Sequence, residues 1–379
     1  MQILKNTKFK AFHKALSLSA EEVIEQVKTS GLTGRGGAHF PTGLKWQFIH
    51  KEKGPDKILI CNADEGEPGT FKDRFIIRNN PELLIEGIAI AAYAIGANRG
   101  YIYLRAEYKN LRPHLEWAIK NHQNELAQIH FRLDIFMGQG AYICGDETAI
   151  MNSIEGYRGE PRSKPPYPAQ LGLFGLPTCI NNVTTLSNVP LIIDGDWSDF
   201  RLFSLSGNVS KPGVYELPPD SSAGDLLALG NPSKPIKALF FGCAGGCVPY
   251  DPKLKLSKEG VADQGAMIGS FAVIAVDEDQ SIPAICRNIA EFFVHESCGG
   301  CTPCREGNVK VLNILNRLTS GDGIPEDIDR LIAWGNFIQD CAFCGLGQTS
   351  NNHVLSALTH FRKEFEELCK SSSMKPVTR

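Results

Sequence analysis

The order of apolar segments between residues 57 and 137 constrains the fold of this chain more than any other feature. Residues 57–61, 101–104 and 131–137 have the composition of buried strands, and residues 80–96 and 110–121 between them have the apolar spacing of helices. Strands that follow one another through helical crossovers pair in parallel. The chain is therefore expected to begin with an α/β domain, over residues 1–195, built on a parallel sheet.

The segments after residue 195 follow a different pattern. Short strand-like stretches surround one predicted helix near residues 225–229, which indicates a small α+β domain over residues 196–280. From residue 281 the apolar residues keep helical spacing, and four predicted helices have clustered cysteines between them. Residues 281–379 are expected to form a helical bundle that presents a metal site, with a disordered tail after Cys369.

The charge balance argues against several classes of partner. Lys and Arg number 39 and Asp and Glu number 42, so the net charge of −3 gives no positive field for nucleic acid or an anionic membrane. No apolar run reaches the ~18 residues of a membrane span, and no secretory signal follows the basic amino terminus. We expect a cytoplasmic protein without direct membrane insertion, at most peripheral on the cytoplasmic membrane through a complex.

Clustered cysteines near the carboxyl end predict a metal site. Cys298, Cys301 and Cys304 have C-x2-C-x2-C spacing, which lets three thiolates surround one corner of a cluster, and Cys341 or Cys344 can supply a fourth. Thiolates select iron–sulfur clusters or zinc, and two C-x2-C pairs would also suit zinc. The spacing alone leaves both metals open.

A glycine-rich segment near the amino end is a candidate cofactor loop. Gly34, Gly36 and Gly37 allow backbone N–H groups to approach a phosphate or a flat ring, and Lys45 can meet an anion. The spacing matches neither the dinucleotide-binding fingerprint nor the P-loop, and no strand directly precedes it. A plain turn is the alternative that this segment alone leaves open.

Two polar loops follow predicted strands. Asp64, Glu65 and Glu67 come after the first of these strands, and the glycine-rich residues 138–148 come after the third. Because parallel α/β sheets hold ligands at the carboxyl ends of their strands, the loops predict one shared nucleotide pocket. For the carboxylates, a solvated acidic turn or a calcium loop is the alternative.

Two later segments carry weaker signals. Lys164 and Tyr167 place a cation beside an aromatic ring, which suits a dinucleotide, although a proline-rich linker would have the same composition. Asn181 and Asn182 are paired amides, which more often stabilise turns than bind ligands.

Together these motifs closely resemble those of the NADH-binding flavoprotein subunits of respiratory complex I. The motifs are Gly34-Arg-Gly-Gly, Asn62-Ala-Asp-Glu-Gly-Glu-Pro-Gly, Gly140-Ala-Tyr-Ile-Cys-Gly, Lys164-Pro-Pro, Asn181-Asn and Glu296-Ser-Cys, in the order typical of that family. The family includes the diaphorase subunits of NAD-linked hydrogenases and formate dehydrogenases. The resemblance extends from about Gly31 to Leu368.

The resemblance implies a fold, cofactors and partners. The fold is a Rossmann-like α/β domain holding FMN, a small β-grasp domain of the soluble-ligand-binding type, and a C-terminal four-helix domain with a [4Fe–4S] cluster. The implied reaction is hydride transfer between NAD(H) and FMN, followed by single-electron transfer to the cluster. The implied partners are a small thioredoxin-like [2Fe–2S] subunit and a larger iron–sulfur or catalytic subunit.

The resemblance also assigns residues position by position. Those expected around the flavin are Gly34, Arg35, Gly36, Lys45, Asn62, Asp64, Tyr142, Gly145, Asp146, Asn181 and Asn182. Gly37, Glu65 and Gly66 in the same loops are also expected to bind cofactor. Those expected to act beside the nicotinamide are Glu67 and Glu147, and those beside the rest of the nucleotide are Phe40, Phe48, Lys164 and Tyr167. The expected cluster ligands are Cys298, Cys301, Cys304 and Cys344. Cys344 is preferred to Cys341 because the family has Leu-Gly one residue beyond the ligand.

The chain also departs from the family pattern. Asp146 stands where Glu is common, and His39 stands where Gly is common.

The sequence that follows Cys344 favours a diaphorase of a hydrogenase or formate dehydrogenase, with the flavoprotein component of complex I as the alternative. A zinc-stabilised scaffold and a stand-alone flavin enzyme are two further classes, and the residues leave NAD or NADP open. Cys243 and Cys247 are expected to be structural thiols.

Overall fold

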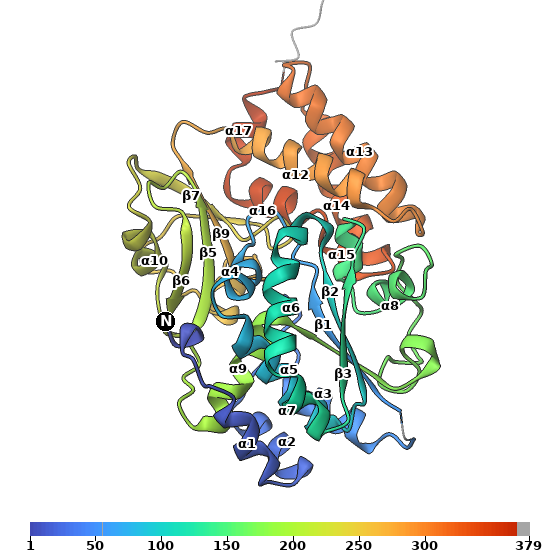
Figure 1. Cartoon of the computed structure of the whole chain (residues 1–379). Helices are drawn as coiled ribbons and strands as arrows, with labels where there is room; N and C mark the ends of the chain where they lie inside the picture. The colour runs from blue at the N-terminus through green and yellow to red at the C-terminus, as the bar shows by residue number, and fades with distance from the viewer. Residues whose placement is uncertain (55, 370–379) are drawn as a thin grey trace, which may run out of the picture. The chain divides into compact units, whose positions relative to one another are not determined.

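The computed structural model describes residues 1–54 and 56–369, and these residues form two compact units (Figure 1). The first unit comprises residues 1–54, 56–66, 70–203 and 216–218, and the second comprises residues 67–69, 204–215 and 219–369. Most of residues 1–195 lie in the first unit, and most of residues 204–369 lie in the second. The tail predicted to be disordered after Cys369 lies outside the described residues.

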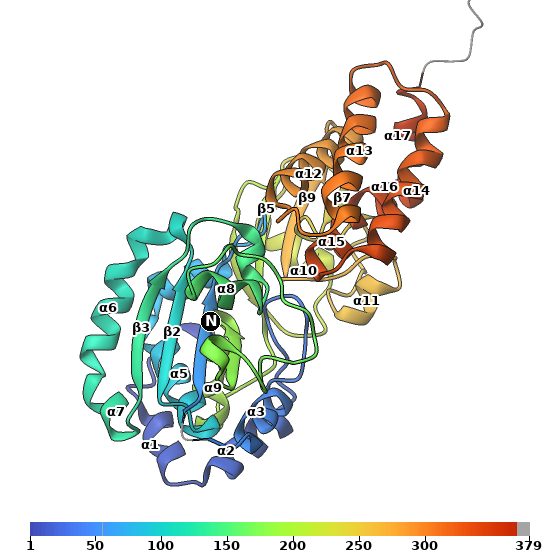
Figure 2. The same cartoon turned by 90° about the vertical axis from the view of Figure 1, so that its right-hand side faces the viewer.

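A four-stranded parallel sheet forms the centre of the first unit, and Figure 2 shows β2 and β3 side by side in it. Its order is β3–β2–β1–β4, with β1 at Ile58–Ala63, β2 at Arg99–Leu104, β3 at Arg132–Met137 and β4 at Thr178–Asn182. The predicted parallel sheet is confirmed. The strand β4 is not among the predicted strands, because it is short and ends in two asparagines, a residue type that is depleted in strands.

Helices α4 to α8 connect the strands of this sheet, whereas α1 to α3 precede β1 and α9 follows β4. The helices are α1 (Lys10–Leu16), α2 (Ala20–Thr29), α3 (Thr42–Lys51), α4 (Lys72–Asn79), α5 (Pro81–Ile95), α6 (Arg112–Asn121), α7 (Gln123–Gln128), α8 (Ala149–Ile154) and α9 (Val183–Asp194). Short 3₁₀ segments occupy Gln2–Leu4, Ala106–Leu111, Tyr142–Gly145 and Leu173–Gly175. The most extensive helix contact joins α5 to α9, and both helices also pack on β1.

The strand register brings the predicted loops to one edge of the sheet. Asn62 near the end of β1 lies opposite Asn182 of β4 on one side and Tyr103 of β2 on the other. Tyr103 in turn lies opposite Phe136 near the end of β3. The loops that leave these strands therefore start at the same level, which is the carboxyl edge where α/β sheets bind ligands.

The second unit contains most of a five-stranded mixed sheet and the C-terminal helices. The strand order is β6–β5–β9–β7–β8, at Gly213–Leu217, Arg201–Gly207, Ala272–Asp277, Ile236–Phe240 and Cys247–Pro249. The accompanying helices are α10 (Ala223–Gly230), α11 (Lys258–Ala262), α12 (Ile282–Glu296), α13 (Thr302–Thr319), α14 (Glu326–Cys341), α15 (Gly345–Thr349), α16 (Asn352–His360) and α17 (Arg362–Glu366). None of the helices among the described residues has the length and apolarity needed to cross a membrane.

One apolar core joins the sheet of the second unit to its helices. Phe240 of β7 and Val276 of β9 belong to the same buried cluster as Ile282 of α12, Leu315 of α13 and Val354 of α16. The boundary predicted at residues 280 and 281 therefore crosses a continuous core.

The close approach of α5 to α9 generates a prediction about stability. A side chain at Gly87 would bring its Cβ atom into steric overlap with the backbone carbonyl of Leu186. We expect Gly87→Ala to destabilise the first unit by about 1–3 kcal/mol, because overpacking forces the two helices apart. Thermal unfolding of the purified protein measures this effect.

The matched control is Gly213→Ala on β6, where the nearest atoms to the added Cβ lie 3.7 Å away. Its unfolding midpoint should stay close to that of the parent protein. Equal shifts in the two variants would show that close helix packing at Gly87 is not the cause.

Candidate functional site

The glycine-rich segment forms a closed loop beside β4. The N–H group of Gly34 donates to the carbonyl oxygen of Phe40 at 2.8 Å, and Thr42 donates to Leu32 at 2.9 Å. The N–H group of Arg35 donates to Oγ1 of Thr185 in the first turn of α9 at 2.9 Å. The hydrogen bond to α9 therefore fixes the loop at the carboxyl edge of the sheet, a position that no strand pattern in the sequence predicted.

Two residues of this loop have unexpected surroundings. Arg35 is only 2% exposed, its guanidinium pairs with Asp199, and burial lowers its pKa to about 10. The buried Arg35 side chain thus stabilises the loop through its ion pair with Asp199. His39 adopts φ of +53°, the left-handed region that glycine favours, which agrees with its place in a position where the family commonly has Gly.

Two lysines converge on one carboxylate. Lys45 Nζ lies 3.3 Å from Oε2 of Glu147 and donates to the carbonyl oxygen of Ile180 at 3.2 Å, and Lys164 pairs with the other carboxylate oxygen. Burial opposes ionisation of Glu147, but the charges of Lys45 and Lys164 outweigh it and hold the pKa of this carboxyl below its ordinary value. The three side chains carry a net positive charge, which favours an anionic ligand.

Three aromatic side chains expected at the nucleotide are exposed. Phe40, Phe48 and Tyr167 are 43%, 47% and 55% exposed. Lys45 Nζ lies 6.0 Å from the centroid of the Phe40 ring. Exposed rings next to cations provide flat surfaces for stacking against a base or a nicotinamide.

The asparagines at the strand ends brace the loops. Asn62 Nδ2 donates to the carbonyl oxygen of Gly145 at 2.8 Å, and its Oδ1 accepts from the N–H group of Asp64 at 3.0 Å. Asn181 accepts from the indole of Trp46 at 2.9 Å. Asn182 caps α9 by accepting from Thr184 at 2.9 Å. These side chains bring the predicted loops together and hold them, so the surfaces left for a ligand are mainly backbone.

Glu65 and Asp146 also serve the local structure. Glu65 accepts from the N–H groups of Asp73 and Arg74, at 2.8 and 3.0 Å, and from the hydroxyl of Tyr108 at 3.1 Å. Burial and then the charge of Asp73 raise the pKa of Glu65 to about 7. Asp146 Oδ1 accepts from Thr148 and Ala149, at 2.8 and 3.1 Å, at the start of α8.

Sequence reasoning missed a buried ion pair beneath this edge. Lys72 is 0% exposed, and its Nζ lies 2.8 Å from Oδ1 of Asp73 and 3.3 Å from Oγ1 of Thr184. Asp73 also accepts from Asn182. Adjacent Lys and Asp residues in a polar segment usually indicate an exposed turn, so only the fold reveals that they join α4 to the start of α9.

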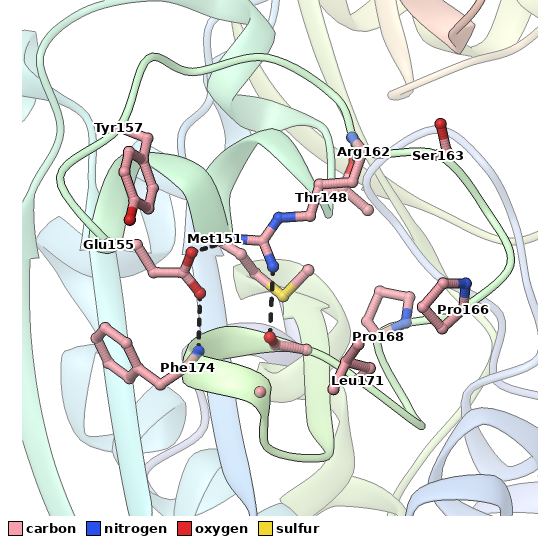
Figure 3. Close-up of a pocket in the computed structure, with 12 residues that line it drawn as sticks. Thr148, Met151, Glu155, Tyr157, Arg162, Ser163, Pro166, Pro168, Leu171 and Phe174 are labelled. Atoms are coloured by element: carbon pink, nitrogen blue, oxygen red, sulfur yellow. Dashed lines mark hydrogen bonds and ion pairs between the residues drawn. The ribbon is translucent and has the colours of Figure 1, made fainter.

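A cavity of about 530 Å³ lies beside the segment that contains Lys164 and Tyr167 (Figure 3). Arg162 pairs with Glu155 inside it, and Glu155 accepts from the N–H group of Phe174 at 2.7 Å. The lining includes Thr148, Met151 and Tyr157, but neither Lys164 nor Tyr167. This cavity is therefore distinct from the set of predicted nucleotide residues.

Glu67 belongs to the second unit, where three donors hold it. The N–H groups of Cys243 and Ala244 donate to its Oε1 at 3.2 and 3.1 Å, and the hydroxyl of Ser270 donates to its Oε2. No motif in the sequence marks Ser270 as a partner of Glu67. Cys243 and Cys247 are buried, with 1% and 0% exposure, and burial raises the pKa of both thiols, as suits structural cysteines.

The predicted cluster ligands gather around the start of α13. Cys301 is the N-cap of this helix and Cys304 lies in its first turn, where the helix dipole favours a thiolate. Burial raises the pKa of Cys304, and the neighbouring thiols of Cys301 and Cys298 raise it further. A side chain at Gly347 would place its Cβ atom 3.6 Å from Cys304 Sγ, so the segment after Cys344 lies against Cys304.

Thiolates are the ligand type that both iron–sulfur clusters and zinc select. Across residues 1–54 and 56–369, no three His, Cys, Asp or Glu side chains converge closely enough to hold a single metal ion. Cys341 is exposed at the end of α14, whereas Cys344 is half-buried as the N-cap of α15.

Two family models match separate parts of the chain. Residues 27–191 match the Nuo51 FMN-binding domain, and residues 284–368 match the iron–sulfur binding region of the NADH-ubiquinone oxidoreductase-F type. The second match favours iron–sulfur over zinc at the clustered cysteines.

Relatives of two kinds align with almost the whole chain. The F-type NADH-quinone oxidoreductase component of Aquifex aeolicus is 43% identical, over 99% of this chain and 92% of the relative. The NADP-reducing hydrogenase subunit HndC of Solidesulfovibrio fructosivorans is 38% identical, over 94% of this chain and 78% of the relative.

A solved structure extends the similarity to the fold. A chain of an NAD⁺-reducing [NiFe]-hydrogenase in the H2-reduced state superposes with a TM-score of 0.90 at 36% identity. The match covers 96% of this chain and 65% of the hydrogenase chain. The chain thus has the parallel sheet, the braced loops and the clustered thiols, and it also aligns with these relatives over nearly its full length. It belongs to the family of F-type NADH-quinone oxidoreductase components, with its FMN-binding domain and iron–sulfur region.

Proposed function

We propose that this chain is the NADH dehydrogenase (diaphorase) subunit of a larger complex, in which hydride passes between NAD(H) and FMN and single electrons pass to a [4Fe–4S] cluster. The observation that carries this proposal is the assembly, at one sheet edge, of the Gly34–Phe40 loop, the Asn62–Gly145 contact and the Lys45–Glu147–Lys164 group. When bound, FMN would accept two electrons together from a hydride donor and release them one at a time to one-electron acceptors. The protein supplies binding, orientation and charge.

The flavin is proposed to lie against the braced loops. Residues of four segments would hold it: Gly34, Arg35, Gly36, Gly37 and Lys45; Asn62, Asp64, Glu65 and Gly66; Tyr142, Gly145 and Asp146; and Asn181 and Asn182. Because the amide side chains are occupied by loop contacts, their main role is to fix backbone donors and acceptors toward the ligand. Such preorganisation aligns a bound ring without further ordering of the protein.

The nucleotide is proposed to bind through charge and stacking. Lys45 and Lys164 provide positive charge beside Glu147, and Phe40, Phe48 and Tyr167 provide exposed rings. Glu67 is proposed to accept from the nicotinamide half of NADH, because its three donors hold the carboxylate in one orientation. No side chain has to remove a proton from carbon in this scheme.

The finer assignments rest on the family. We assign the five-stranded sheet region to a β-grasp domain and α12–α17 to the cluster domain, with Cys298, Cys301, Cys304 and Cys344 as ligands. A thioredoxin-like [2Fe–2S] subunit and a larger iron–sulfur subunit are the proposed partners, on the cytoplasmic side. The similarity to hydrogenase subunits favours a hydrogenase or formate dehydrogenase diaphorase, and 92% coverage of the Aquifex relative supports the complex I alternative.

An anaerobic visible absorption spectrum with iron and flavin analysis tests this function. We expect about one FMN and about four irons per chain, as a single [4Fe–4S] cluster requires, and bleaching on addition of NADH. Separate addition of NADPH decides the nucleotide preference. A protein that contains zinc, lacks flavin and shows no response to either nucleotide would contradict the proposal and support a scaffold role.

A pair of cysteine variants tests the fourth cluster ligand. Cys344→Ser is expected to lose most of the bound iron, because only three thiolates remain to hold the cluster. Cys341→Ser is the matched control, three residues away and exposed at the end of α14, and should keep its iron. Iron analysis and the EPR spectrum of the reduced protein measure both. Iron loss in Cys341→Ser alone would reverse the assignment.

Replacement of Glu67 tests its role in nucleotide binding. Glu67→Gln keeps the shape and most hydrogen bonds but removes the charge, and charge-assisted hydrogen bonds are about 1 kcal/mol stronger than neutral ones. The KM for NADH is therefore expected to rise about fivefold, with little change in the rate at saturation. Stopped-flow bleaching of the flavin at several NADH concentrations measures both quantities.

Glu116→Gln on α6 is the control for this variant, because Glu116 forms an exposed pair with Arg112. Flavin reduction at the parent rate at low NADH in Glu67→Gln would rule out a contact between Glu67 and the nucleotide.

A further inference from the structure

A buried polar network lies directly behind Cys304. Asn308, one helical turn after Cys304 on α13, is 2% exposed, and its Nδ2 donates to Cys304 Sγ at 3.4 Å. Its Oδ1 accepts from Ser350 Oγ at 3.0 Å and from Asn351 Nδ2 at 2.9 Å. Ser350 and Asn351 are themselves 1% and 2% exposed. Ser350 Oγ also lies 2.8 Å from the carbonyl oxygen of Gly347, so its single proton is shared between two acceptors. Because Asn351 Nδ2 donates to the amide oxygen of Asn308, the NH₂ group of Asn308 is the part that faces the sulfur.

A second side chain reaches the same sulfur from the loop before α13. Ser297 Oγ lies 3.3 Å from Cys304 Sγ and accepts from the N–H group of Gly299 at 3.2 Å. A hydroxyl that accepts from an N–H group still has its own proton to donate. When Cys304 is a thiolate, which has no proton, Ser297 is the donor of this pair. Cys304 thus receives hydrogen bonds from two different elements.

Apolar packing alone does not explain why Asn308 is buried. Burying an amide without hydrogen-bond partners destabilises a protein by about 1–3 kcal/mol, whereas an apolar side chain of similar volume at this position would pack without that cost. The network satisfies Asn308 only because Ser350 and Asn351 are oriented toward it. The network therefore holds the NH₂ group of Asn308 as a hydrogen-bond donor to Cys304 Sγ.

We propose that Ser297 and Asn308 raise the reduction potential of the cluster by donating hydrogen bonds to Cys304 Sγ, with Ser350 and Asn351 fixing the orientation of Asn308. This inference rests on the proposed function, in which Cys304 is a cluster ligand. Reduction adds one electron, part of whose charge lies on the ligand sulfurs. A hydrogen bond to sulfur therefore stabilises the reduced form more than the oxidised form. Ser297 and Asn308 are positioning residues, since they act through Cys304.

Redox titration of the full, cofactor-loaded protein, followed by EPR, tests this inference. In Ser297→Ala and in Asn308→Leu, the ratio of reduced to oxidised cluster at a fixed potential should fall about tenfold, which is about 59 mV for one electron. Ser297→Thr retains the hydroxyl and should restore the parent potential. The control on the same helix is Asn316→Leu, whose side chain is exposed and accepts from Nε of Arg287 at 2.8 Å.

The outcomes separate this inference from the proposed function. Full iron content with an unchanged potential in both Ser297→Ala and Asn308→Leu would overturn the role of the network and leave the cluster in place. A parent protein without a [4Fe–4S] signal would instead overturn the function itself. If Asn308→Leu fails to fold, Ser297→Ala and Ser297→Thr decide the question, because Ser297 lies in a loop and its hydroxyl is not needed by α13.

Discussion

The pairing of β4 with β1 is the contact on which the candidate flavin site depends. It places Asn182 opposite Asn62, so that the start of α9 and the acidic loop after β1 leave the sheet side by side. Asn182 then caps α9 and also donates to Asp73 at the start of α4. Without this pairing, the glycine-rich loop would lose its anchor on Thr185, because that residue lies in the first turn of α9.

Hydrogen bonds, more than apolar packing, give the sheet edge its shape. Lys72 and Asp73 are charged groups without solvent, and such a pair is tolerated only when every remaining donor and acceptor has a partner. Here Thr184 accepts from Lys72 and donates to Asp73, and Asn182 donates to the other oxygen of Asp73. The result is a polar surface whose geometry is set before any ligand arrives, with aromatic rings left exposed at its border. Rigid polar loops beside accessible rings suit a ligand that is both charged and flat.

Much of this organisation is encoded locally and could be predicted. The parallel sheet follows from the alternation of strand and helix patterns, and the loops follow from glycines and carboxylates at strand ends. The fourth strand, the buried Lys72–Asp73 pair, Ser270 and Asn308 could not be found in this way. Each owes its role to a partner far along the chain, such as Ser270 to Glu67 and Asn308 to Ser350. Local composition carries no signal for such pairs.

The continuous core of the second unit has a consequence for how this family can be rearranged. Phe240 and Val276 of the sheet share their apolar cluster with Ile282 and Val354 of the helices, and the N–H group of Cys247 donates to Ser356 of α16 at 2.9 Å. A cut at residue 280 would expose apolar side chains on both pieces and break this bond. The cysteine-bearing helices therefore cannot be transferred to another protein without their sheet. Recombination that separates the helices from the sheet would yield two fragments that expose apolar surface and aggregate. Only exchanges that transfer the sheet and the helices together preserve the core.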